Sequence, residues 1–200
     1  MLDKLRMRVT DHKPRIIEAA GLPEAGVLIP ITCVHHEPEI ILTLRSRRLS
    51  THSGEVAFPG GRRDPGDVDL QFTALRETHE EIGLPPEMID VIGPMDSLVS
   101  RFGIKVTPYV GIVPDVYELK PNADEIEEVF RVPVRYLLED PREMTHRIDY
   151  EGRSWYVPSY RYEGFKIWGL TALMLTELMN VAFDAKIPLS IPYEPEKKSR

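Results

Sequence analysis

Three glutamates that share one helical face constrain this chain more than any other feature. Residues 76–84 read Arg-Glu-Thr-His-Glu-Glu-Ile-Gly-Leu, which places carboxylates at Glu77, Glu80 and Glu81. Positions i, i+3 and i+4 of an α-helix lie on one face, where each like-charge pair destabilises an isolated helix by about 0.2–0.5 kcal/mol. Such a helix therefore needs stabilisation from packing or from a ligand.

The opposite face of this predicted helix supplies an apolar anchor. Phe72, Leu75 and Ile82 fall roughly across from Glu77 when residues are placed about 100° apart. A solvated acidic stripe is the alternative interpretation of a charge run, but an anchored helix gives its acidic face a fixed direction. Hard oxygen ligands in fixed directions suit Mg²⁺ or Mn²⁺. The sequence therefore predicts a divalent-metal site on the three glutamates.

An arginine-rich segment precedes the helix. Between positions 45 and 63, Glu55 is the only acid beside five arginines, namely Arg45, Arg47, Arg48, Arg62 and Arg63. Arginine forks recognise phosphate oxygens bidentately, whereas carboxylates alone would repel a phosphate. We therefore predict a phosphate-containing substrate contacted by Arg45, Arg47, Arg48 and Arg62. The alternative is that these are ordinary surface arginines whose stems cover apolar groups.

Composition narrows the classes of protein. The chain has 200 residues, enough for one domain with a short appendage. Its net charge of −7 argues against broad nucleic-acid binding. Cys33 is the single cysteine, so no intrachain disulfide can form. Because no apolar run approaches about 18 residues, we expect no membrane span and a cytoplasmic location.

The pattern of apolar residues and breakers predicts an α+β fold. Helices are expected at 2–20 with a break at Pro14, at 68–82, at 133–138 and at 168–183. Strands are expected at 25–33, 39–44, 55–58, 90–92, 96–99, 105–113, 127–132 and around 147–162. These elements indicate α/β/α layers around a mixed sheet. We divide the chain into an N-terminal helical extension (1–24), one catalytic domain (25–187) and a frayed tail (188–200).

The glycine loop and the helix together resemble the Nudix box, GX5EX7REUXEEXGU, in which U is a bulky aliphatic residue. Gly61 is followed by five residues, then Asp67, eight residues and the run from Arg76 to Leu84. Thr78 stands at the first U position. Asp67 replaces the usual glutamate, and the spacer after it is one residue longer. The resemblance extends over roughly residues 25–185 and implies a Nudix-type α/β/α sandwich.

This resemblance also implies a reaction. Nudix enzymes hydrolyse a nucleoside diphosphate linked to another moiety, using divalent cations held by the box glutamates. It implies that Glu77, Glu80 and Glu81 bind Mg²⁺ or Mn²⁺, with the Gly61 carbonyl as a further ligand. The general base is then Glu77 or Glu125, the latter because segment 121–126 is similar to one that carries a late acid in a subfamily. Arg76 is expected to be structural, pairing with Glu80.

A second resemblance concerns the substrate. The segments 41–46 and 58–61, with Gly54 between them, resemble the coenzyme A diphosphatase pattern LLTXR[S/A]X3RX3GX3FPGG, and residues 167–172 also look like that subfamily. Ser50 stands where the pattern has arginine. The resemblance implies hydrolysis of coenzyme A to 3′,5′-ADP and 4′-phosphopantetheine.

Two alternatives remain open at this stage. One is a Nudix diphosphatase acting on ADP-ribose, other nucleoside diphosphate sugars or dinucleotides, which the departure at Ser50 favours. The other is a non-catalytic nucleotide-sensing Nudix domain, against which stands the retention of all three box glutamates. The sequence does not predict the oligomeric state.

Overall fold

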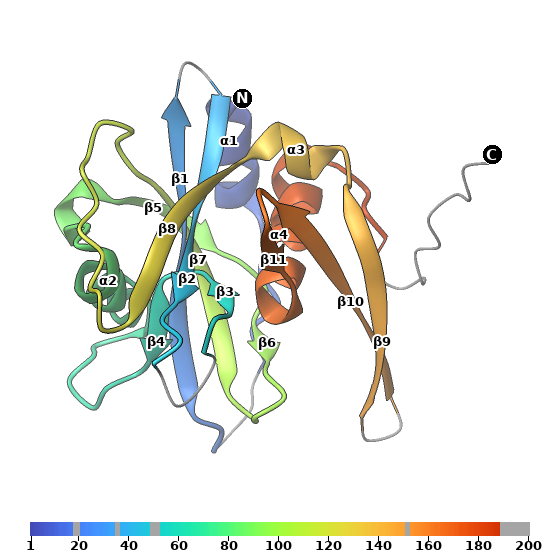
Figure 1. The fold of residues 1–200 in the computed structure, drawn as a ribbon, viewed down its shortest axis with the longest axis horizontal. Helices are drawn as coiled ribbons and strands as arrows, with labels where there is room; N and C mark the ends of the chain where they lie inside the picture. Colours follow the sequence, from blue (N-terminus) through green and yellow to red (C-terminus); the bar gives the residue numbers. More distant parts are fainter. Residues whose placement is uncertain (18–20, 35–36, 49–52, 151–152, 189–200) are drawn as a thin grey trace.

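A mixed β-sheet lies between two helical layers in the computed structural model, which describes residues 1–17, 21–34, 37–48, 53–150 and 153–188 (Figure 1). The helices are α1 (Leu2–Asp11), α2 (Leu70–Ile82), the 3₁₀ turn η1 (Pro86–Met88), α3 (Val134–Leu138) and α4 (Gly169–Phe183). The strands are β1 (Glu24–Val34), β2 (Glu37–Arg45), β3 (Val56–Ala57), β4 (Gly60–Arg62), β5 (Asp90–Pro94), β6 (Leu98–Val99), β7 (Lys105–Ile112), β8 (Ile126–Pro133), β9 (Arg142–Tyr150), β10 (Arg153–Tyr162) and β11 (Phe165–Ile167).

Strand β1 is the centre of the main sheet. The strand order is β3-β2-β1-β7-β5, while β4 pairs with β1, β6 with β7 and β8 with β2. The β1–β7 pair is parallel, and its neighbours in the sheet are antiparallel. A second sheet of three strands has the order β11-β10-β9. The predicted mixed sheet is confirmed.

The two faces of the main sheet are covered by different helices. Helix α2 lies on one side, and α1 and α4 lie on the other (Figure 1). The cluster under α2 includes Leu28, Ile41, Ala74, Ile82 and Leu84. The larger cluster on the other face includes Leu5, Val9, Ile29, Ile31, Leu42, Leu175 and Leu178. The predicted α/β/α layering is therefore confirmed.

Helix α2 is anchored by smaller residues than the sequence suggests. Ile82 is fully buried as predicted, but Phe72 is 45% exposed, so its predicted anchoring role is wrong. The buried contacts come instead from Ala74 and Thr78. The helix approaches β1 so closely that a Cβ added to Gly26 would lie 2.1 Å from the Leu70 carbonyl oxygen. A bulky residue has no room at such a close approach.

The replacement Gly26→Ala should therefore destabilise the fold. The clash is with backbone, which cannot move aside as a flexible side chain can. We expect the free energy of unfolding in urea to fall by at least about 2 kcal/mol, within the usual range for overpacking. The matched control is Gly66→Ala, whose added Cβ meets nothing within 4 Å. Equal unfolding midpoints for the two variants would contradict the close approach of α2 to β1.

Local signals explain where the helices begin and end. The Asp69 side chain accepts a hydrogen bond of 2.7 Å from the Phe72 N–H, so α2 starts at Leu70 and not at 68. Gly83, at φ 70°, ends it as predicted. Helix α1 ends at Asp11, well short of the predicted residue 20. Among the described residues, no helix is both long and apolar enough to cross a membrane.

Candidate active site

Asp67 clamps the loop before α2 onto the helix. Its buried carboxylate accepts hydrogen bonds of 3.0 Å from both Nε and Nη2 of Arg76. It also accepts bonds from the Thr73 hydroxyl at 2.8 Å and the Asp64 N–H at 3.0 Å. The Arg76 guanidinium holds the pKa of Asp67 well below its usual range. Asp67, which departs from the box pattern, therefore has hydrogen-bond partners for both of its carboxylate oxygens and holds the loop in place.

Arg76 also orders two of the three box glutamates. Its Nη1 donates to Glu77 Oε1 at 2.9 Å and to Glu80 Oε2 at 3.1 Å. The second contact is the predicted i,i+4 pair, which is confirmed. Its Nη2 further donates to the Arg62 carbonyl at 3.3 Å, which ties β4 to the helix. One guanidinium therefore sets the positions of the loop, the strand and the acidic face.

Glu77 lies directly over the backbone of Gly61. A Cβ built on Gly61 would fall 2.4–2.6 Å from the carbon and oxygens of the Glu77 carboxylate. Strand β4 holds Gly61 opposite Gly26 of β1, the same residue against which α2 packs. Burial raises the pKa of Glu77, and the charges of Glu80 and Glu125 act in the same direction. Position 61 requires a glycine because the Glu77 carboxylate occupies the space that a side chain at this position would fill.

Glu81 is the deepest acid of the site. Its side chain is only 2% exposed and accepts hydrogen bonds from Arg45 Nη1 at 3.0 Å and from the Gly60 N–H at 3.1 Å. Burial raises its pKa to about 7, although Arg45 and the Gly60 N–H act to lower it. A carboxylate this poorly compensated favours a nearby cation. The role of the Gly60 N–H was not predicted from the sequence.

These donors fit a hard divalent cation by their chemistry. Mg²⁺ and Mn²⁺ prefer oxygen ligands, which the three carboxylates and the backbone carbonyl of Gly61 supply. Within the described residues, however, the oxygens of Glu77, Glu80 and Glu81 do not all come within 4.8 Å of one another. Arg76 Nη1 bridges Glu77 and Glu80, whereas Arg45 and the Gly60 N–H hold Glu81 separately.

The segment before β8 closes another side of the site. The Asn122 N–H donates to the Glu81 carbonyl at 2.9 Å, and the Ser46 N–H donates to the Glu125 carbonyl at 2.8 Å. Glu125 is partly buried and lies close enough to influence the pKa of Glu77. The charge of one acid proposed as general base therefore acts on the other. The contact through Asn122 carries no sequence signal, because it uses backbone atoms alone.

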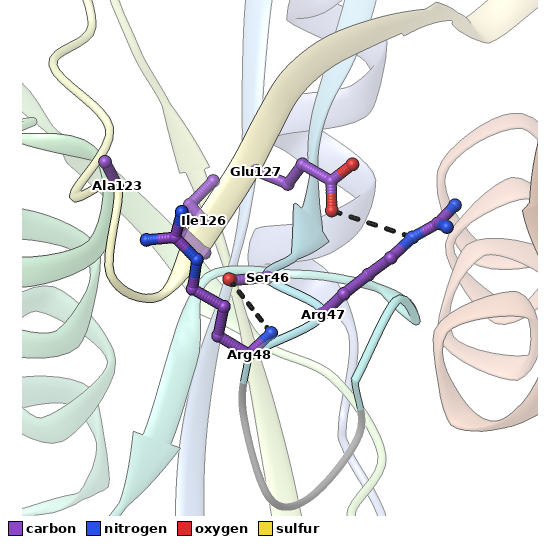
Figure 2. Close-up of a pocket in the computed structure, with 6 residues that line it drawn as sticks. All are labelled: Ser46, Arg47, Arg48, Ala123, Ile126 and Glu127. Carbon is purple, nitrogen blue, oxygen red and sulfur yellow. Dashed lines mark hydrogen bonds and ion pairs between the residues drawn. The ribbon is translucent and has the colours of Figure 1, made fainter.

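Two of the predicted substrate-binding arginines line an open pocket of about 310 Å³ (Figure 2). Its lining residues are Ser46, Arg47, Arg48, Ala123, Ile126 and Glu127. Arg47 is largely exposed, with its Nε 3.9 Å from a Glu127 oxygen, and the Arg48 N–H donates to Ser46 Oγ at 3.3 Å. Arg62 is exposed on β4. Ser50 lies outside the described residues.

Arg45 is placed differently from these arginines, since its guanidinium contacts Glu81. We expect Arg45→Ala to lower kcat at least tenfold with little change in KM, because Glu81 loses the charge that holds it. Arg45 also lowers the pKa of Glu81. Its removal should therefore shift the acidic limb of the pH–rate profile to higher pH. Arg45→Lys should restore part of kcat, as a point charge without the fork geometry.

The opposite kinetic pattern would support the substrate contact predicted from the sequence. In that case Arg45→Ala would raise KM several-fold, leave kcat unchanged and leave the pH profile in place. Steady-state kinetics across pH 5–9 distinguishes the two roles of this arginine.

Comparison with known proteins identifies the family of this chain. The NUDIX domain family matches residues 23–152. The chain is 41% identical over 160 residues to the uncharacterized Nudix hydrolase NudL of Yersinia enterocolitica, covering 80% of this chain and 82% of that protein. It is 42% identical over 154 residues to NudL of Yersinia pestis, covering 77% of each.

Solved structures show the same fold at low identity. A MutT/nudix family protein from Enterococcus faecalis matches with a TM-score of 0.56 and 14% identity, covering 92% of this chain and 70% of that chain. An Ap4A hydrolase of C. elegans matches with a TM-score of 0.50 and 16% identity, covering 59% and 85%. This chain belongs to the Nudix family. It is a Nudix hydrolase, an enzyme class that acts on phosphoric anhydrides and generally uses divalent metal ions.

Proposed function

We propose that this Nudix hydrolase cleaves the diphosphate linkage of coenzyme A or its derivatives. The products are 3′,5′-ADP and 4′-phosphopantetheine, or acyl-phosphopantetheine from an acyl derivative. The observation that carries the proposal is the arginine-lined pocket beside the box helix. Coenzyme A carries a 3′-phosphate that ADP-ribose and most dinucleotides lack, and Arg48 offers a cationic side chain to such a group. Arg47 extends in the opposite direction beside Glu127 (Figure 2), and its exposed side chain can turn toward the same group.

The metal proposal rests on the acidic face of α2. Glu77, Glu80 and Glu81 would hold Mg²⁺ or Mn²⁺, with the Gly61 carbonyl as a further ligand. When bound, the ion neutralises phosphate oxygens and lowers the pKa of a coordinated water. The carboxylate chemistry of this face supports these roles. Arg76 and Arg45 hold the three glutamates on it without substrate present, and a shared ion would require Glu80 or Glu81 to turn from its present contact.

Hydrolysis also needs a group that accepts a proton from water. The water oxygen forms a bond to one phosphorus, the bridging P–O bond breaks, and a carboxylate takes the proton. Glu77 and Glu125 are the two candidates. Burial raises the pKa of Glu77, which makes it a stronger base than an exposed glutamate. Its contact with Arg76 opposes this effect, so Glu125 is retained as the alternative.

The competing function is hydrolysis of ADP-ribose, other nucleoside diphosphate sugars or dinucleotides. One structural neighbour is an Ap4A hydrolase of C. elegans, but at 16% identity it shows the fold alone. A non-catalytic nucleotide sensor is the third candidate, and metal-dependent turnover of any diphosphate would exclude it. The cytoplasmic location stays a prediction.

The experiment compares coenzyme A with 3′-dephospho-coenzyme A, which share every group except the 3′-phosphate. With Mg²⁺ or Mn²⁺, the wild type should show a kcat/KM at least several-fold higher for coenzyme A. The double variant Arg47→Ala/Arg48→Ala should lose most of that preference while retaining its kcat. The matched control is Arg135→Ala, an exposed arginine on α3 that does not line the pocket.

Two outcomes would overturn the assignment. Equal kcat/KM values for both compounds in the wild type would remove the pocket as a 3′-phosphate site. A higher kcat/KM for ADP-ribose, NADH or a dinucleoside polyphosphate in the same assay would favour the competing function.

A further inference from the structure

Three side chains of types that can bind a metal ion lie close together on the side of the sheet opposite to α2. His12 follows α1, Asp96 lies between β5 and β6, and Glu177 belongs to α4. The His12 Nε2 is 3.2 Å from an Asp96 oxygen and 4.0 Å from a Glu177 oxygen. All three ligand atoms lie within 4.8 Å of one another. Helices α1 and α4 pack together on this face, so three separate segments converge there (Figure 1).

The spacing of these atoms is close to that of a tetrahedral metal site. Zinc–nitrogen and zinc–oxygen bonds of about 2.0–2.1 Å place neighbouring ligands roughly 3.3 Å apart. The observed separations of 3.2 and 4.0 Å lie near this value, and a rotation of the Glu177 side chain would shorten the longer one. An imidazole with two carboxylates favours Zn²⁺, Co²⁺ or Ni²⁺ over Mg²⁺. The three side chains are partly exposed, which leaves a fourth position for water.

The backbone around the cluster holds the two carboxylates in place. The Arg15 N–H donates to Asp96 Oδ1 at 2.9 Å, and the Asp96 N–H donates to Glu177 Oε1 at 2.9 Å. The Arg15 carbonyl in turn accepts a hydrogen bond of 3.0 Å from the Ser97 N–H. Hydrogen bonds of this kind orient metal ligands before the ion arrives. Backbone N–H groups therefore hold both carboxylates of the cluster in place.

The charges of the cluster are unevenly compensated. Asp96 and Glu177 are acids that lie next to each other in space. In the part of the chain that the structure describes, Arg15 is the arginine paired with Asp96, at 3.7 Å from a largely exposed position. A bound cation would offset this concentration of negative charge.

We propose that His12, Asp96 and Glu177 bind a transition-metal ion of the Zn²⁺ class, separate from the ions of the hydrolytic site. The ion would join the segment after α1 to α4 and to the β5–β6 connection. Its role is structural, because the cluster lies across the sheet from Glu77, Glu80 and Glu81. The alternative account of the same contacts is a polar clamp made only of hydrogen bonds.

The test measures metal binding in a protein whose box is disabled. Chelator-treated Glu80→Gln protein is titrated with Zn²⁺ by calorimetry and with Co²⁺ by visible absorption. One equivalent should bind, with the intense d–d bands of four-coordinate Co²⁺ and a rise in melting temperature. Adding His12→Gln or Glu177→Gln should weaken this binding at least tenfold. Because His12→Gln keeps a polar side chain toward Asp96, it preserves the clamp while removing the imidazole.

Two results would overturn the proposal. The first is the lack of a Zn²⁺ equivalent in the Glu80→Gln protein, which would leave the hydrogen-bonded clamp as the explanation. The second is equal Zn²⁺ affinity with and without His12→Gln and Glu177→Gln, which would place the ion elsewhere. Neither result depends on turnover, so failure of this proposal is distinguishable from failure of the proposed hydrolase function.

Discussion

Glu80→Gln and Glu81→Gln should each lower kcat by at least about a hundredfold, equivalent to about 2.7 kcal/mol in the activation barrier. Glutamine keeps the size of the side chain and removes the charged oxygen that a divalent cation requires. The two residues reach this site by different routes, since Glu80 is exposed beside Arg76 and Glu81 is buried beside Arg45. Loss of activity in both would therefore point to a shared ligand role and not to one broken contact.

The matched control for these variants is Glu118→Gln, an exposed glutamate outside the site that should keep wild-type kcat. Circular dichroism and urea unfolding verify that each variant is folded. Retention of more than about a tenth of wild-type kcat in both box variants, a barrier change below about 1.4 kcal/mol, would contradict the ligand assignment.

Gly61→Ala should also remove most of the activity while leaving the fold nearly unchanged. The added Cβ would lie 2.4–2.6 Å from the Glu77 carboxylate, which is the movable end of a side chain. The carboxylate must therefore swing away, breaking its contact with Arg76. We expect kcat to fall at least about thirtyfold, equivalent to about 2 kcal/mol, and the free energy of unfolding to change by less than about 1 kcal/mol.

The same loop provides a control for Gly61→Ala. An added Cβ at Gly66 meets nothing within 4 Å, so Gly66→Ala introduces one methyl group without a clash. Steady-state kinetics of the two alanine variants isolates the effect of Glu77 displacement from a general stiffening of the loop. Equal kcat values in Gly61→Ala and wild type would show that Glu77 can leave Gly61 without loss of function.

The predictability of the fold depends on the kind of signal. Strong local patterns were sufficient for β1, β2, β7, α2 and α4, which lie within a few residues of their predicted bounds. The sequence-based predictions were wrong or incomplete where contacts between distant segments determine the structure. Phe72 was expected to anchor α2, but the close approach at Gly26 favours Ala74 and Thr78. Strand β4 has no apolar pattern and exists because Gly60, Gly61 and Arg62 pair with β1.

The candidate site shows the same division. The spacing of Glu77, Glu80 and Glu81 on one helix was readable because it follows from helix geometry alone. The partners of those glutamates were not, since Arg45 reaches Glu81 across 36 positions of sequence. The sequence also did not predict the hydrogen bonds between Asp67 and Arg76, although it showed that Asp67 departs from the box pattern. Substrate and metal roles of these residues stay predictions.

The most direct measurement of the central claim is a competition assay. Equimolar coenzyme A and ADP-ribose are mixed with wild-type enzyme and Mg²⁺ or Mn²⁺, and the initial rates are read from separated products. Their ratio at equal concentration gives the ratio of kcat/KM without separate fits. The account predicts that 3′,5′-ADP and 4′-phosphopantetheine form faster than AMP and ribose 5-phosphate. Faster formation of AMP would contradict it and assign the enzyme to the ADP-ribose class.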